Sequence, residues 1–306
     1  MIKKIVILFC LFNNLLFSQK KETTLVDLKG NVKEVKFYED EFLKRTIQFN
    51  INGFITNYKE FSKNEDADFI ECNYNKNGDK TSCSNGKIIS NYEYDENNNI
   101  IKETNLSIKN LDTLGYKINE YSDHNLVKTI TYEFTEKKKK IVSETIYKYD
   151  NSRNLVEEVD KTVDGKIYQK IAYKYDSKNN KIEYSRQHPL SSVSGHELYI
   201  YDSNNNLIKS LKYNPENKLL HKSVYIYDDN NNKIRKTNYY KNEKINIIEY
   251  KYDSRKNIIE EKEYKKGQLI NITYREFDDI GNEISMKIVD NKGGIIELNK
   301  KEISYY

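Results

Sequence analysis

Several residue types are scarce in this 306-residue sequence. It has no Trp and only 11 Phe against 27 Tyr, while 32% of its residues are charged. Such a chain can cover a thin sheet with Tyr and Ile but cannot fill a thick aliphatic core. After Gln19, no apolar run is long enough for a membrane-spanning helix. We therefore expect neither an ordinary globule nor an integral membrane helix protein.

Sequence motifs of enzymes and cofactor sites are also missing. No nucleophile elbow, phosphate loop or dinucleotide fingerprint occurs. Zinc-type spacing is absent among the four histidines, which are His124, His188, His196 and His221. Asp202-x-Asn204-x-Asn206 imitates the start of a calcium loop, but Leu207 and Tyr213 stand where Gly and Glu are needed. We predict a non-enzymatic protein with no metal and no cofactor, and the net charge of +4 is too small to indicate a nucleic-acid partner.

The first 18 residues have the pattern of a secretory signal peptide. Lys3 and Lys4 precede a short apolar stretch, and Ser18 comes just before polar sequence begins at Gln19. We expect residues 1–18 to be a signal peptide and residues 19–306 to form the mature domain. The protein is then exported to the periplasm, the cell surface or the exterior.

A short pattern, Tyr-x-Tyr-Asp, recurs along the mature part. Complete copies lie at Tyr92–Asp95, Tyr147–Asp150, Tyr173–Asp176, Tyr199–Asp202, Tyr225–Asp228 and Tyr250–Asp253. Degenerate copies flank them, such as Tyr74–Asn75 and Phe277–Asp278, so that the period is about 26 residues. Regular spacing of this kind indicates a tandem repeat.

Each repeat unit has the local pattern of hairpins. The two Tyr rings lie on one strand face, Asp begins a turn, and Gly or Asn at the fourth turn position tolerates positive φ. A second set of turn residues, such as Asp164-Gly165 and Asn214-Pro215, lies midway between these turns. We predict an all-β fold of about eleven antiparallel hairpin repeats, hence roughly twenty-two strands. Accumulated twist should curl this long sheet into an open spiral or cylinder, with the Tyr rings inside the curve.

The Tyr-x-Tyr-Asp copies, together with Gly30-Asn31 and Gly281-Asn282, resemble the YD-repeat (Rhs-type) family. The resemblance covers nearly all of residues 19–306. It implies a curved β-sheet, which in large members of the family forms a spiral shell around a toxin. This sequence has no toxin-like C-terminal region and no counterpart of the self-cleaving aspartate segment. It resembles a small exported member without a toxin region.

Two cysteines remain after the expected cleavage, Cys72 and Cys83, and they flank the turn from Asn75 to Asp79. A two-residue turn would place them opposite each other, whereas a three-residue loop with a bulge would place Cys72 opposite Ser82. Apolar residues seven positions after each repeat aromatic favour the first register, and the Asp-x-x-Gly turn chemistry favours the second. We expect a structural disulfide because exported proteins fold in an oxidising compartment.

The tyrosines of the repeats are the candidate functional residues. Either they pack as a cross-strand ladder, or they form a stacking surface for sugars or a partner protein. The set consists of Tyr147, Tyr149, Tyr173, Tyr175, Tyr199, Tyr201, Tyr225, Tyr227, Tyr250 and Tyr252.

The predicted function is a cell-envelope or extracellular binding or scaffold module whose partner is a glycan or a surface protein. An alternative of another class is an accessory protein of an Rhs-like toxin or adhesion system. An outer-membrane β-barrel is the third alternative, although Lys and Glu on both strand faces argue against it.

Overall fold

The computed structural model describes residues 28–62, 65–135, 138–189 and 193–306, so the predicted signal peptide lies outside the described residues. The described chain contains strands and no α-helix. The strands are β1 (Val32–Glu39), β2 (Phe42–Phe49), β3 (Ile55–Ser62), β4 (Glu65–Tyr74), β5 (Lys80–Ser84), β6 (Ile88–Tyr94), β7 (Ile100–Ser107), β8 (Thr113–Ser122), β9 (Asn125–Thr135), β10 (Lys138–Tyr149), β11 (Leu155–Thr162), β12 (Ile167–Tyr175), β13 (Lys181–Gln187), β14 (Gly195–Tyr201), β15 (Leu207–Tyr213), β16 (Leu219–Tyr227), β17 (Lys233–Tyr240), β18 (Glu243–Tyr252), β19 (Ile258–Lys265), β20 (Gln268–Phe277), β21 (Glu283–Asp290) and β22 (Ile295–Tyr305).

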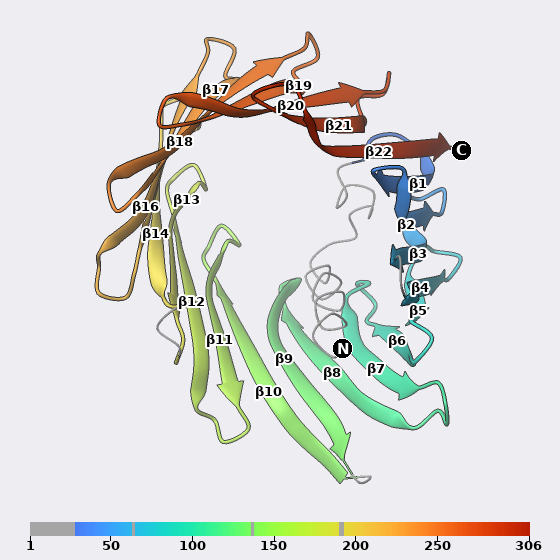
Figure 1. Ribbon diagram of the computed structural model, residues 1–306. Helices are drawn as coiled ribbons and strands as arrows, with labels where there is room; N and C mark the ends of the chain where they lie inside the picture. The colour runs from blue at the N-terminus through green and yellow to red at the C-terminus, as the bar shows by residue number, and fades with distance from the viewer. Residues whose placement is uncertain (1–27, 63–64, 136–137, 190–192) are drawn as a thin grey trace.

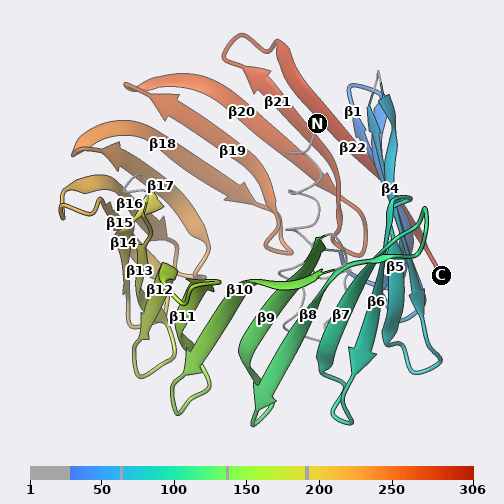
Figure 2. The same ribbon diagram turned by 90° about the horizontal axis from the view of Figure 1, so that it is seen from below.

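These strands form one sheet that closes on itself. Each strand pairs antiparallel with the next, and β22 also pairs with β1 through partners such as Val35 and Ile303. Figures 1 and 2 show the strands running around a ring, with the first and last strands side by side. The prediction of a hairpin repeat with about twenty-two strands is confirmed. The cylinder is closed, however, where an open one was expected.

The turns of one rim follow the predicted Asp chemistry. In the turn 228–232, one Asp228 carboxylate oxygen accepts hydrogen bonds from the backbone N–H groups of Asn230 (3.0 Å) and Asn232 (2.8 Å). Asn231 adopts a φ of 61°, which Asn tolerates better than most residues. The turns that begin at Asp95, Asp150, Asp176, Asp202, Asp253 and Asp278 make the same two carboxylate contacts. We call this end of the cylinder the Asp-turn rim.

A β-bulge follows these turns and resolves the conflict between the two registers. Tyr74 pairs with Lys80, as the three-residue loop requires, but Cys72 pairs with Cys83. The register shifts between Asn73 and Tyr74, because one extra residue is inserted in the second strand. Both sequence patterns were therefore correct, each for a different part of the hairpin.

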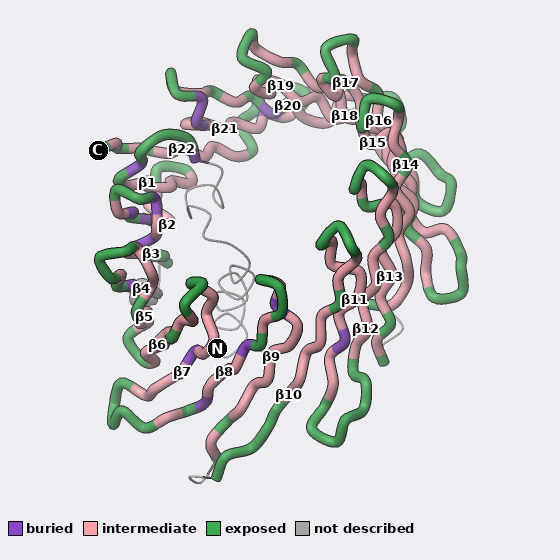
Figure 3. Tube along the Cα trace, turned by 180° about the vertical axis from the view of Figure 1, so that it is seen from behind, coloured by how far each residue is buried: buried purple, intermediate pink, exposed green. Residues whose placement is uncertain are grey.

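The well-buried core lies where the sheet closes, over β1 to β5. Its members include Val32, Val35, Ile47, Phe49, Ile55 and Ile70, each at most 9% exposed. Around the rest of the ring, most strand residues are only half-buried, as Figure 3 shows. Such a distribution agrees with the thin sheet that the composition predicts.

Candidate functional site

The second tyrosine of each Tyr-x-Tyr pair ties one repeat unit to the unit before it. The hydroxyl of Tyr175 donates a hydrogen bond to the backbone oxygen of Leu155 (3.1 Å), and that of Tyr227 donates to Leu207 (3.0 Å). The same contact recurs from Tyr94, Tyr149, Tyr201 and Tyr252, and from Tyr121 of a degenerate copy, to residues 14 to 23 positions earlier. The second tyrosines of the candidate set therefore have a structural role, because their hydroxyl groups connect neighbouring repeat units.

The first tyrosine of each pair has different surroundings. Tyr173 packs its ring 5.7 Å from that of Tyr184, and Tyr199 donates a hydrogen bond to the Glu197 carboxylate (2.8 Å). Burial raises the pKa of Tyr147, Tyr173 and Tyr250 to about 12. These rings are partly buried but still reach solvent, as do those of Tyr199 and Tyr225.

Next to these tyrosines, polar side chains form a hydrogen-bonded band across the same sheet face. Asp160 accepts hydrogen bonds from Thr145 Oγ1 (2.7 Å) and Gln169 Nε2 (3.0 Å). Arg186 Nε donates to Gln169 Oε1 (2.7 Å). These four residues come from four consecutive strands, β10 to β13.

A similar series continues across later strands. Ser223 donates to Asn238 (2.7 Å), Asn238 to Asn246 (2.8 Å), and Asn246 to Glu263 (2.7 Å). Sequence reasoning missed this band, because its members are 8 to 17 residues apart in the chain. The sequence does contain one indication of the band: a polar residue stands two positions before the first tyrosine of several Tyr-x-Tyr pairs, as at Thr145, Glu197 and Ser223.

Charged groups also approach the rings. Lys181 Nζ lies 5.4 Å from the ring centroid of Tyr173 and 5.8 Å from that of Tyr199, and Lys233 Nζ lies 4.4 Å from that of Tyr250. Glu158 pairs across the sheet with Tyr147, and burial raises the pKa of its carboxyl group. The face that carries the paired tyrosines therefore combines flat rings with amide, carboxylate and cationic groups. We call it the Tyr face.

A shallow pocket of about 430 Å³ lies at the Asp-turn rim between two neighbouring turns. Lys178, Ile182, Tyr199, Ile200 and Asp202 are among the residues that line it. The Asp202 carboxylate already accepts hydrogen bonds from its own turn, including two from Asn206 (2.9 and 3.0 Å), and these contacts lower its pKa. Within the described residues, no group of three His, Cys, Asp or Glu side chains is placed to hold a metal ion.

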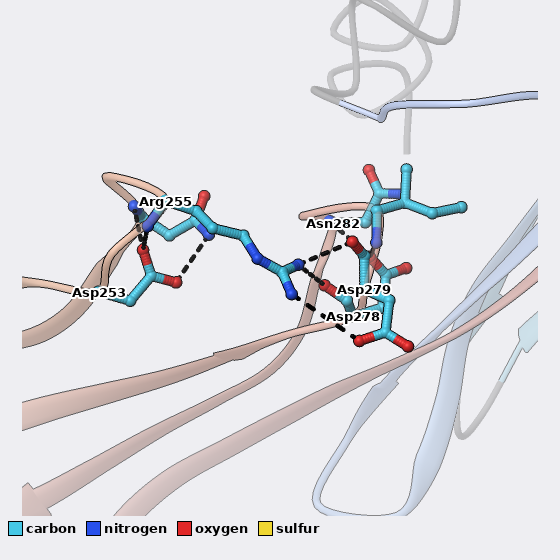
Figure 4. Close-up of polar contacts among 7 residues, drawn as sticks. Asp253, Arg255, Asp278, Asp279 and Asn282 are labelled. Atoms are coloured by element: carbon cyan, nitrogen blue, oxygen red, sulfur yellow. Dashed lines mark hydrogen bonds and ion pairs between the residues drawn. The ribbon is translucent and has the colours of Figure 1, made fainter.

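Adjacent turns of the Asp-turn rim are also linked to one another. Arg255 Nη1 donates a hydrogen bond to the backbone oxygen of Asp279 in the next turn (2.7 Å), as Figure 4 shows. Asn206 Nδ2 donates to the side-chain oxygen Oδ1 of Asn231 in the next turn (2.9 Å). At the closure, the fully buried Asn282 accepts a hydrogen bond from the backbone of Lys29 (2.6 Å) and donates one back (3.0 Å). These contacts connect neighbouring turns over the part of the rim that leads to the closure.

Cys72 and Cys83 are joined by a disulfide between β4 and β5. The two residues are direct cross-strand partners, and Cys72 is 6% exposed within the core cluster.

Three of the four histidines each pack against a tyrosine rather than against one another. The ring of His196 stacks on that of Tyr213 at 4.6 Å, and that of His221 lies 5.1 Å from Tyr240. The His188 ring meets the ring of Tyr168 edge-on at 4.7 Å.

In the part of the chain that the structure describes, no helix is long and apolar enough to cross a membrane.

Fold and site together define a closed-cylinder β-hairpin repeat protein. No family model and no curated protein matches the sequence. Among solved structures, the chain is similar to TcdB2-TccC3 without its hypervariable C-terminal region, with 12% identity and a TM-score of 0.37. That match covers 92% of this chain and 19% of the other, so this chain spans about a fifth of its length.

The chain is also similar to two porin-like proteins. For the one from Bacteroides uniformis ATCC 8492, the identity is 10% and the TM-score 0.36, with 90% of this chain and 99% of the other covered. For the one from Bacteroides vulgatus ATCC 8482, the identity is 9% and the TM-score 0.27, with 91% and 99% covered.

Proposed function

We propose that this protein is an exported, non-enzymatic binding module of the YD-repeat type that recognises glycans through its Tyr face. One observation carries the proposal: in the sector β11 to β13, the rings of Tyr173 and Tyr184 lie beside the hydrogen-bonded group of Asp160, Gln169 and Arg186. A sugar presents an apolar face of C–H groups and a rim of hydroxyls. Flat aromatic rings match the first, and fixed planar polar groups match the second.

Hydrogen bonds among the polar groups favour binding because they preorganise the site. Gln169 is held at both ends, by Asp160 and by Arg186. A side chain that is already immobilised loses little conformational entropy when a ligand arrives. The remaining donors and lone pairs of Asp160, Gln169 and Arg186 are then available for sugar hydroxyls.

The contacts of the recurrent Asp side chains support a non-enzymatic role. The Asp carboxylates of the turns accept hydrogen bonds from their own backbone, as at Asp150 and Asp176. Hydrogen bonds from Asn154 and Asn180 lower the pKa of these two carboxyl groups, which suits turn formation and not proton transfer near neutral pH. The exported location rests on the pattern of residues 1–18 and on the Cys72–Cys83 disulfide.

The direct test is a glycan array followed by calorimetry on the glycans that bind. Tyr184→Ala removes a ring from the proposed site and should weaken binding about tenfold, the value of one aromatic contact of roughly 1.4 kcal/mol. Tyr239→Ala is the matched control, because Tyr239 lies on the opposite sheet face against Lys222 and its loss should leave affinity unchanged. Absence of glycan binding, or equal loss in both variants, would contradict the proposal.

A further inference from the structure

The rim opposite the Asp-turn rim carries exposed apolar side chains on three neighbouring hairpins. The β7–β8, β9–β10 and β11–β12 hairpins end there, and Figure 1 shows their ends along the lower edge of the ring. We call these ends the apolar tips and define them as residues 107–114, 138–142 and 162–168. Their most exposed apolar residues are Leu111 (63%), Leu114 (40%), Ile141 (42%), Val163 (54%), Ile167 (60%) and Tyr168 (49%).

Leu111 stands out because local turn chemistry does not explain it. Its φ is 58°, in the left-handed region that favours Gly and Asn. Among the described non-glycine residues with positive φ, Leu111 is the sole apolar one. A leucine here strains the turn and leaves its side chain in water, so neither folding nor packing accounts for the residue. Insertion of the Leu111 side chain into the surface of a binding partner accounts for a leucine at this position.

Charge at the apolar tips is predominantly cationic. Lys109, Lys138 and Lys140 are exposed, and none of them forms an ion pair with another described residue. The acids of the tips are engaged locally: Asp112 accepts a hydrogen bond from Asn110, and Asp164 pairs with Lys166 at 2.7 Å. By contrast, the turns of the opposite rim are rich in acids, with Asp95, Glu96, Asp228, Asp229, Asp278 and Asp279.

We propose that the apolar tips dock on the surface of an anionic lipid bilayer. Aliphatic side chains and Tyr enter the headgroup region, while the lysines contact lipid phosphates. Composition favours a bilayer over a protein partner, since protein interfaces are enriched in Trp and Arg and depleted in Lys. The apolar tips contain five Lys and no Arg, although Arg occurs elsewhere in the described chain. Separate tips also suit individual insertion better than one continuous protein contact.

Co-sedimentation of the purified protein with lipid vesicles tests the proposal. We expect binding to vesicles of phosphatidylcholine with phosphatidylglycerol, at least about tenfold weaker binding to phosphatidylcholine alone, and weakening by added salt. The double variant Leu111→Asn, Val163→Asn should lose about tenfold in partitioning to the anionic vesicles. Because Asn suits the left-handed turn, Leu111→Asn alone should leave the melting temperature unchanged or higher, which separates lost binding from unfolding.

The matched control changes apolar residues on the Asp-turn rim. Ile51 and Ile280 are exposed to a similar degree (55% and 47%), so Ile51→Asn, Ile280→Asn should keep full binding. No sedimentation with anionic vesicles would overturn the proposal, as would equal losses in the two double variants. The assay contains no glycan, so its outcome does not depend on the proposed function.

Discussion

Replacing the second tyrosine of a repeat by phenylalanine removes one hydrogen bond and leaves the ring in place. Tyr149 is the best position, because its hydroxyl donates to the backbone oxygen of Leu126 at 2.9 Å and Leu126 is 3% exposed. A typical hydrogen bond contributes about 1 kcal/mol, and leaving a buried acceptor unpaired costs about 1–3 kcal/mol. We therefore expect Tyr149→Phe to lower the free energy of unfolding by about 1–2 kcal/mol.

The corresponding bond from Tyr201 to Lys181 (3.0 Å) is exposed to solvent. Water can replace the lost hydroxyl there, so Tyr201→Phe should cost less, about 0.5 kcal/mol. Urea unfolding followed by circular dichroism measures both values, with Tyr239→Phe on the opposite face as a control expected to stay within about 0.5 kcal/mol of the parent. No loss from Tyr149→Phe, or a larger loss from Tyr201→Phe, would refute a structural role for these hydroxyls.

Further predictions concern pH and the disulfide. The turn hydrogen bonds lower the pKa of Asp95, Asp150 and Asp228 in the folded state, so their contribution is present above pH about 4 and is lost as the pH falls below it, which acid titration of the melting temperature measures. Burial raises the pKa of Tyr147, Tyr173 and Tyr250 to about 12, so the contribution of the neutral hydroxyls is full below pH about 10 and is lost between 10 and 12; a melting temperature that stays constant over that interval would contradict it. Cys72 and Cys83 are 11 residues apart, so replacing both by Ser should cost about 2–3 kcal/mol in urea unfolding, and two free thiols in mass spectra of the unreduced parent would show that the bond is absent.

The parts of the fold that could be predicted from the sequence are those set by residues close together in the chain. Asp228 and Asn231 define their turn at a fixed offset, and Tyr225 and Tyr227 share a face because strands alternate. A bulge at Ile234 shifts the register between β16 and β17, so the pairing expected from the turn holds on one side of it and the pairing expected from the strand pattern holds on the other. Closure could not be predicted, because it depends on twist summed over all strands and on contacts such as Lys29 with Asn282.

The candidate site was predicted only in part. The Tyr pairs were found from their spacing, but their two roles were not separable, since a hydroxyl such as that of Tyr175 finds its acceptor 20 residues away. Asp160, Gln169 and Arg186 were missed because no local pattern joins them. Export, the glycan partner and the alternative role beside an Rhs-like toxin or adhesion system stay predictions.

A designed cross-link between β1 and β22 tests whether the sheet closes into a cylinder. Lys36 and Glu302 are cross-strand partners in these two strands, so Lys36→Cys, Glu302→Cys should form a disulfide within one chain on mild oxidation. Lys36→Cys with Glu249→Cys in β18 is the control that should not cross-link. Peptide mapping by mass spectrometry should find the 36–302 link in the monomer; its absence, or links only between molecules, would contradict a closed sheet.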